Sequence, residues 1–383
     1  MIMNRMICLL LLPLLCCACL SPVQLKNTSY EERQWLLSGE ALPGVDAAEL
    51  ALEDERILYV TREMQAFARK AVEGLSGRER ITALLQALVH PSGLNLQYDS
   101  EASFTAEEVF SEGRANCLSF TNIFIAMGRY LDMDVQYNEV DVPPIWDLRS
   151  GNTMVLNKHI NAMVTRIGSR HVVDLNIEEY EPYYEQRYID DRLAVAQHYN
   201  NKAMAHLIEQ DYTQALRYMR KALFMEPGVS YLWNNLGSMY RRAGNLKAAE
   251  LSYLAAIEAD EDDLVALSNA ARLYKDIGNT ELATHFSNKA HKFRMQNPYF
   301  IFGMAQMAFL ENDYEMAQEH VTEAISLNDQ EHRFYFLKGA IYEKTGMPEL
   351  ASDNFNKALE LSGDEKQQAR YRSKMHRLAA AKS

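Results

Sequence analysis

Cysteine is scarce in this sequence, with five residues in 383, and four of them lie within the first nineteen positions. Cys117 stands outside that segment and has no thiol near it along the chain. This distribution excludes the framework of intrachain disulfides that staples small secreted domains. Cys117 is therefore expected to be either a buried small residue or a reactive group.

Positive charge is also in short supply. The chain has 39 lysines and arginines against 52 aspartates and glutamates, so its formal net charge is −13. A nucleic-acid binder needs a cationic face, and the acidic balance argues against that class. Proline is limited to 10 residues and 48% of the chain is hydrophobic, which predicts a folded protein, and the length of 383 residues suggests two or three domains.

Metal-binding spacings are missing from the sequence. It does not contain two separate Cys-x-x-Cys pairs, and it contains no His-Glu-x-x-His run. Such spacings bring several ligands to one ion, so we expect neither a metal site nor a cofactor.

The amino-terminal segment, MIMNRMICLLLLPLLCCACLSPV, has the pattern of an export signal. Arg5 precedes an apolar run from Met6 to Ala18. The run is shorter than the roughly 20 apolar residues that span a bilayer. We therefore interpret residues 1–18 as a signal peptide and exclude them from the fold.

This segment resembles a bacterial lipoprotein signal, in which a small residue precedes the lipidated cysteine. The resemblance implies lipidation of Cys19 after Ala18, although Leu14 with Cys17 offers a second register. Plain cleavage or an uncleaved anchor is the alternative. Two or more acyl chains give stable anchoring, so the resemblance implies a membrane-attached protein of the cell envelope that faces the periplasm, with the outer membrane favoured.

The second half of the chain repeats itself with a period of 34 residues. Small residues recur at three equivalent positions, and a large or apolar residue recurs at a fourth. The first two series are Ala215, Ala249, Ala283, Ala317, Ala351 and Ala222, Ala256, Ala290, Ala324, Ala358. The other two are Ala203, Gly237, Ala271, Ala305, Gly339 and Tyr199, Trp233, Leu267, Ile301, Tyr335.

This pattern resembles the tetratricopeptide repeat over about 170 residues. The resemblance implies five repeats across 196–365, each a pair of antiparallel helices in which small residues permit close packing. Each pair buries its apolar face against its neighbours, which predicts a solenoid. Residues 366–383 are expected to form a polar capping helix.

The family's inner helices line a concave face, and the resemblance carries its binding positions onto this chain. These binding positions form two groups: the residues of the first carry an amide or a positive charge, and those of the second are mostly aromatic. The positions are Asn234, Arg241, Arg242, Arg272, Lys275, Tyr299, Phe302, Phe309 and Leu310. They suit an extended protein or peptide partner with acidic groups and aromatic anchors. Alternatively, the basic residues pair with the acidic run at 259–263 and the aromatic residues form inter-repeat core.

The first half of the chain combines helical and strand patterns. Apolar spacing predicts helices over 55–75 and 78–90, and a capping box begins another at Thr105. After Gly113, the run CLSFTNIFIAMGRYL predicts a buried helix that begins at Cys117. Free backbone N–H groups and the helix dipole favour a thiolate at that position.

Two strand-like runs follow, and they contain His159 and Asp174. A helix that opens on cysteine, a strand with histidine and a strand that ends on aspartate together resemble the transglutaminase-like superfamily. That resemblance covers residues 100–180 and implies Cys117 as nucleophile, His159 as general base and acid, and Asp174 as the acceptor that orients the histidine. Taken singly, a cysteine such as Cys117 is more often a buried small residue, a strand histidine such as His159 is more often structural, and Asp174 is more often a strand-end cap.

The hairpin geometry raises a difficulty for this triad. A flat hairpin that turns at Gly168 and Ser169 would set Asp174 opposite Met163, so twist or a bulge would be needed to reach His159. His171 is a rival base on the second strand.

The sequence therefore predicts an α+β transglutaminase-like domain over residues 30–190, followed by an all-α repeat solenoid. The expected function is thiol hydrolysis or acyl transfer, as in a cysteine peptidase or amidase, on a protein that the repeats recruit. The alternative is a non-catalytic scaffold lipoprotein for protein–protein interaction.

Overall fold

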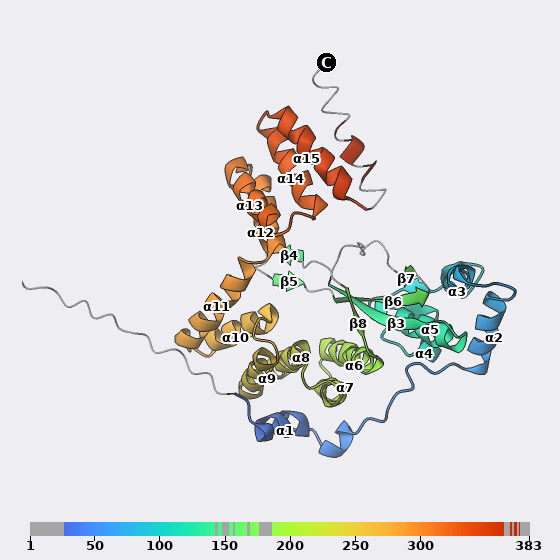
Figure 1. The fold of residues 1–383 in the computed structure, drawn as a ribbon. Helices are drawn as coiled ribbons and strands as arrows, with labels where there is room; N and C mark the ends of the chain where they lie inside the picture. The colour runs from blue at the N-terminus through green and yellow to red at the C-terminus, as the bar shows by residue number, and fades with distance from the viewer. Residues whose placement is uncertain are drawn as a thin grey trace, which may run out of the picture.

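A computed structural model describes residues 27–141, 145–147, 153–155, 158–166, 169–175, 186–363, 368–369, 371–373 and 375. The expected signal peptide, Cys19 and most of the expected capping helix at 366–383 lie outside these residues. Within the described residues, no helix has both the length and the apolar character that crossing a bilayer requires. The chain folds into a region that contains a sheet and a curved helical array (Figure 1).

The sheet region has a central helix packed against four antiparallel strands. The strands, in spatial order, are β7 (Ser169–Val173), β6 (Lys158–Arg166), β3 (Val135–Asp141) and β8 (Gln186–Ile189). The helices are α2 (Arg62–Ala71), α3 (Arg78–Val89), α4 (Ala106–Glu112) and α5 (Cys117–Tyr130). Two small sheets complete the region: β1 (Gln97–Tyr98) with β2 (Arg114–Ala115), and β4 (Ile145–Asp147) with β5 (Thr153–Val155).

Helix α5 is the core of this region because it is apolar on nearly all its faces. Phe120, Ile123 and Phe124 are fully buried, and the helix lies between the sheet and helices α2, α3 and α4. The sequence prediction of a helix over 55–75 was too long. Helix α2 begins only at Arg62, where the Thr61 side chain accepts from the Met64 N–H and caps it.

The array consists of five helix pairs at the predicted period. The pairs are α6 (Asp191–Ile208) with α7 (Tyr212–Met225), α8 (Ser230–Arg242) with α9 (Leu246–Ala259), α10 (Leu264–Asp276) with α11 (Thr280–Arg294), α12 (Pro298–Leu310) with α13 (Tyr314–Leu327), and α14 (His332–Lys344) with α15 (Pro348–Leu361). Gly237 shows why the recurring position is small. A Cβ there would lie 2.6 Å from the Tyr253 ring on the partner helix.

The segment that precedes the sheet region packs on the array. Helix α1 (Tyr30–Ser38) and the 3-10 helix η1 (Ala47–Leu50) place Leu36 and Leu50 in the same core as the first repeats. The Tyr240 hydroxyl donates to the Leu36 carbonyl, and Asn245 Nδ2 donates to the Ala41 carbonyl at 2.7 Å. The expected first domain, 30–190, thus began too early, because residues 30–50 bury their apolar side chains against helices that follow it.

Polar contacts join the sheet region to the first repeat. Arg129 on α5 makes two hydrogen bonds, of 2.6 and 2.9 Å, to Asp191 at the start of α6. The buried Glu139 on β3 accepts from Gln197 Nε2 on α6 at 2.7 Å. Farther along the array, strand β4 lies against α12 (Figure 1). The sheet region therefore stands on the inner side of the array's curve.

Candidate functional site

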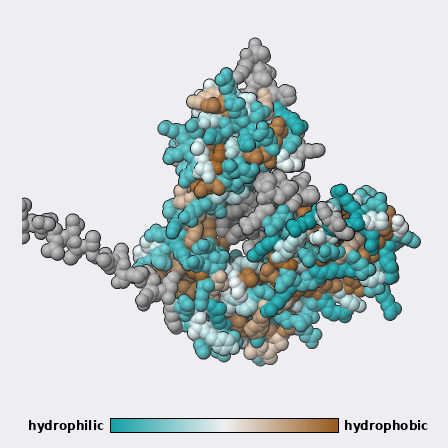
Figure 2. All heavy atoms as spheres, viewed as in Figure 1, coloured by the Kyte–Doolittle hydropathy of each residue, from teal (hydrophilic) through white to brown (hydrophobic). Residues whose placement is uncertain are grey.

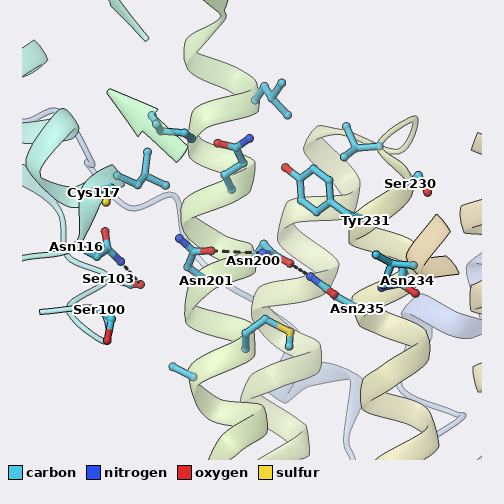
Figure 3. A pocket seen from close by; sticks show the side chains of 18 of the residues that line it. Ser100, Ser103, Asn116, Cys117, Asn200, Asn201, Ser230, Tyr231, Asn234 and Asn235 are labelled. Atoms are coloured by element: carbon cyan, nitrogen blue, oxygen red, sulfur yellow. Dashed lines mark hydrogen bonds between the residues drawn. The ribbon is translucent and has the colours of Figure 1, made fainter. Parts of the chain in front are cut away.

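A cleft of about 2230 Å³ lies between the sheet region and the inner helices of the array. Cys117 and Asn116 stand on one wall, and Asn200, Tyr231 and Asn235 stand on the other (Figure 3). Pockets for small molecules measure roughly 300–1,000 Å³. The size of this cleft suits a segment of a macromolecule.

Cys117 is the first residue of α5, as the sequence predicted. The Asn116 side chain caps this helix by accepting from the Ser119 N–H at 2.9 Å, and it donates to Ser103 Oγ at 3.0 Å. The first N–H groups of an α-helix have no acceptor within the helix, so the start of α5 offers donors beside the thiol. Cys117 is partly exposed and lines the cleft.

His159 and Asp174 meet across the β6–β7 hairpin. The register differs from the flat arrangement expected from the sequence. Met163 pairs with Val172 and Ala162 pairs with Val173. Continued by one residue, this register sets Asp174 opposite Asn161. His159 and Asn161 lie on one face of β6, and both side chains hydrogen-bond Asp174 Oδ2. Diagonal neighbours of this kind are within reach of each other, so no bulge is needed.

The electrostatics of His159 follow from these contacts. The residue is only 4% exposed, and burial alone would lower its pKa. Hydrogen bonds to Asp174 and Cys117 outweigh burial and raise the pKa of His159 to about 10. Because Asp174 engages Nε2, Nδ1 is the ring nitrogen left for the thiol. A protonated imidazole there stabilises a thiolate and can later give its proton to a leaving group.

His171, the rival base, occupies a different position. It pairs with Val164 on β6, and its Nε2 lies 3.2 Å from Ser169 Oγ near the hairpin turn. The structure thus brings together Cys117, His159 and Asp174 and leaves His171 with a neighbour of its own strand.

The wall opposite Cys117 carries asparagine pairs that link successive inner helices. Asn235 Nδ2 on α8 donates to Asn200 Oδ1 on α6 at 2.8 Å, and Asn269 Nδ2 on α10 donates to Asn234 Oδ1 at 2.9 Å. Each amide has more donor and acceptor capacity than its one inter-helix bond uses. These asparagines can therefore both donate hydrogen bonds to a peptide backbone that lies across them and accept hydrogen bonds from it.

The repeat pattern has counterparts among known proteins. A family model described as Tetratricopeptide repeat matches residues 200–263, and a second model of that description matches residues 332–365. The chain contains tetratricopeptide repeats. The repeats make protein–protein interaction the function class that the array indicates, because such solenoids present extended concave surfaces.

Two curated relatives match part of the chain. A TPR repeat-containing protein of Methanocaldococcus jannaschii is 24% identical over 226 residues, which cover 56% of this chain and 36% of the relative. Anaphase-promoting complex subunit 3 of Schizosaccharomyces pombe is 22% identical over 165 residues, covering 43% and 25% respectively. The match therefore spans well under half the length of either relative.

Solved structures give similar partial matches. The MamA protein is 21% identical, covers 46% of this chain and 94% of its own, and has a TM-score of 0.25. YrrB, described as a TPR protein with an unusual peptide-binding site, is 16% identical, covers 46% and 92%, and also has a TM-score of 0.25.

Seven of the nine positions expected to bind a partner fall into three groups. Asn234, Arg242 and Tyr299 line the cleft, while Arg241 and Arg272 join Arg242 around a smaller neighbouring pocket. Lys275 and Leu310 are exposed on α10 and α12.

Phe302 and Phe309 correct the expectation for the aromatic positions. Phe302 is 9% exposed, and its ring centroid lies 4.7 Å from that of Phe334. Phe309 packs against Tyr314 with centroids 5.7 Å apart. Phe302 on α12 packs against α14 of the next repeat, which is the alternative that the sequence left open, whereas Phe309 and Tyr314 lie on the two helices of one repeat. The other alternative, that the arginines pair with the run at 259–263, does not hold for Arg241, because its partner is Asp276.

Asn200, Asn201 and Asn235 line the cleft and were not selected from the sequence, and neither was Asn269 of the neighbouring pocket. A signal for them exists in the repeat period. Asn200 and Asn234 are one period apart, and Asn201, Asn235 and Asn269 are spaced by the same 34 residues.

Proposed function

We propose that the tetratricopeptide array holds an extended segment of a partner protein along the wall of the cleft opposite Cys117. This wall, here called the asparagine wall, carries Asn200, Asn234 and Asn235. The observation that carries this proposal is the pairing of Asn200 with Asn235 and of Asn234 with Asn269 across successive inner helices. Asn200 and Asn234 are 8% and 4% exposed, so their side chains are held in place by packing. Ordered amides bind a peptide backbone at a small entropic cost.

An extended main chain is the ligand that this wall fits. Its N–H and C=O groups alternate in direction, and asparagine amides both donate and accept. Such contacts do not depend on side-chain identity, so specificity must come from other residues of the cleft. The hydrophilic outer surface in Figure 2, with hydrophobic residues only in scattered patches, offers no broad apolar face for a partner on the side shown.

The test compares two double variants of the full chain. Asn234→Ala/Asn235→Ala removes amides from the wall, and Asn288→Ala/Asn356→Ala removes exposed amides from α11 and α15 as a matched control. Partners would be recovered from the native membrane by cross-linking and quantified by mass spectrometry. We expect at least a tenfold loss of a specific partner with the wall variant alone; equal recovery with both variants would reject the proposal.

A second candidate function is thiol acyl transfer at Cys117. It is favoured by the hydrogen-bonded series Cys117, His159, Asp174 at the edge of the same cleft. The Cys117 sulfur would attack an amide carbonyl carbon, the C–N bond would break, and His159 would give its proton to the departing amine. Water or an amine would then attack the thioester and release Cys117. Incubation with the partner followed by intact-mass analysis tests for this acyl-enzyme, which Cys117→Ala must lose.

Export and lipid anchoring at Cys19 form the third part of the proposal. The support is the sequence of the first nineteen residues, with Ala18 before Cys19. An anchored chain would present the cleft to proteins of the cell envelope. Metabolic labelling with a fatty-acid analogue tests this directly. Label is expected on the wild-type chain in the outer-membrane fraction and not on Cys19→Ala, and equal label on both would reject Cys19 as the site.

A further inference from the structure

A smaller pocket of about 380 Å³ opens on the array beside the cleft. Its lining consists of Ser238, Arg241, Arg242, Tyr253, Asn269 and Arg272. Two of these residues connect it to the asparagine wall. Arg242 lines both spaces, and Asn269 is the residue whose amide bonds Asn234. A segment that follows the wall from Asn200 toward α10 therefore arrives at this pocket.

The charge of the pocket contrasts with that of the whole chain, which carries a net charge of −13. Three guanidinium groups line it. Arg241 is held by an ion pair with Asp276, whereas Arg242 and Arg272 are exposed and, within the described part of the chain, form no ion pair with a carboxylate. Three cations gathered without a matching set of anions repel one another, and a bound anion would relieve that repulsion.

Neutral donors stand among the arginines. Burial raises the pKa of the Tyr253 phenol, although the arginines act in the opposite direction, so the phenol stays protonated at neutral pH. Its oxygen lies 3.4 Å from Ser238 Oγ. The Asn269 amide adds further donor capacity. Guanidinium forks combined with hydroxyl and amide donors recognise oxyanions, because each oxygen can accept several hydrogen bonds.

We propose that this pocket binds an oxyanion, a carboxylate or a phosphoryl group, carried by the partner segment that lies along the asparagine wall. The inference rests on the proposed function of the array and adds the chemical class of the partner. The wall would hold the backbone without regard to sequence, and the arginine pocket would select segments that carry an acidic group at one position. Specificity would thus come from charge placed at a defined distance along the segment.

The test uses fluorescein-labelled octapeptides of alanine and glutamine whose central pair is Asp-Asp, Asn-Asn or phosphoserine-Ala. Fluorescence anisotropy with the full chain, up to 1 mM protein at low salt, gives each dissociation constant. We expect the Asp-Asp or the phosphoserine peptide to bind about tenfold tighter than the Asn-Asn peptide, since two charge-assisted contacts are added. The ratio between the two acidic peptides distinguishes a carboxylate site from a phosphoryl site. High salt should remove the preference.

Charge-matched variants separate the pocket from general attraction. Arg242→Gln/Arg272→Gln should bring all three peptides to equal affinity, whereas Lys247→Gln/Lys357→Gln, on α9 and α15, should keep the preference. Equal affinities with the wild-type chain, no binding of either acidic peptide, or a preference that survives in the arginine variant would overturn the inference. Equal but measurable binding of all peptides would leave the asparagine wall standing and reject only the oxyanion pocket.

Discussion

The carboxylate of Asp174 hydrogen-bonds Nε2 of His159 diagonally across the β6–β7 hairpin. The same oxygen accepts from Asn161 Nδ2 at 3.3 Å, so it is held from two positions on β6. This contact fixes the plane of the imidazole, whose other hydrogen-bond partner is Cys117. A buried carboxylate in this position also favours the protonated imidazole.

Alkylation of Cys117 should depend on His159. At pH 7, iodoacetamide should modify Cys117 faster in the wild-type chain than in His159→Ala, because His159 with a pKa of about 10 is protonated and its charge favours the thiolate. His171→Ala is the matched control and should follow the wild type. Equal rates in the wild type and in His159→Ala would contradict the pairing of the thiolate with His159.

Asp174→Asn should return the titration of His159 toward the usual histidine range. The substitution removes the carboxylate charge and replaces one of its two oxygens with an amide NH2, so it weakens both the charge and the hydrogen bond that raise the pKa of His159. Imidazole NMR resonances of His159 should stay unchanged between pH 5 and 8 in the wild type and shift within that range in the variant. If His159 titrates near pH 6.5 in both proteins, Asp174 does not control its protonation.

Stability in acid should depend on Glu55. Burial alone would raise the pKa of Glu55, but hydrogen bonds and charges from His198 and Lys202 lower it to about 2. A lowered carboxyl pKa contributes stability above the unfolded value of 4.5, and that stability is lost as the pH falls from 4.5 toward 2. Urea unfolding should show Glu55→Gln less stable by about 1–2 kcal/mol at pH 7, after allowing for solvent screening, with a smaller difference at pH 3. A difference that does not change with pH would exclude this ionisation as the cause.

Gly237→Ala should destabilise the second repeat. The added Cβ would lie 2.6 Å from the Tyr253 ring, and overpacking of this kind costs about 1–3 kcal/mol. Gly228→Ala provides the control, because no atom lies within 4 Å of a Cβ at that position. Thermal unfolding should therefore show a lower midpoint for Gly237→Ala and an unchanged or slightly higher one for Gly228→Ala. Equal midpoints would mean that α8 and α9 can move apart at no cost.

The array was largely predictable from the sequence, because its helix pairs repeat local chemistry. Small residues such as Gly237 and Gly339 recur where a neighbouring ring approaches, so a fixed period carries the packing. The binding positions were less predictable. The binding positions were taken from the repeat family by their place on the inner helix. This selected Phe302, which the structure buries, and passed over Asn235, whose partner Asn200 lies on another helix.

Two other features had no local signal. The packing of Leu36 near Tyr240 joins positions 204 residues apart, and an amphipathic segment does not state which distant surface it will cover. The contact of His159 with Asp174 depends on the register of the β6–β7 hairpin. A shift of the turn by one residue changes every opposed pair in the hairpin. The types and order of the three residues of the candidate triad were predictable, and their geometry was not.

Photo-cross-linking from position 231 tests the central claim most directly. A photoreactive phenylalanine analogue in place of Tyr231 would stand on the wall opposite Cys117 and leave the asparagines intact, and one in place of Asn356 would stand on the exposed surface of α15 as the control (Figure 3). After irradiation of cells that produce each variant, mass spectrometry would identify the peptide joined to each position. We predict that position 231 captures one extended segment of a partner protein and that position 356 does not. No capture at 231, or the same proteins at both positions, would contradict a partner held in the cleft.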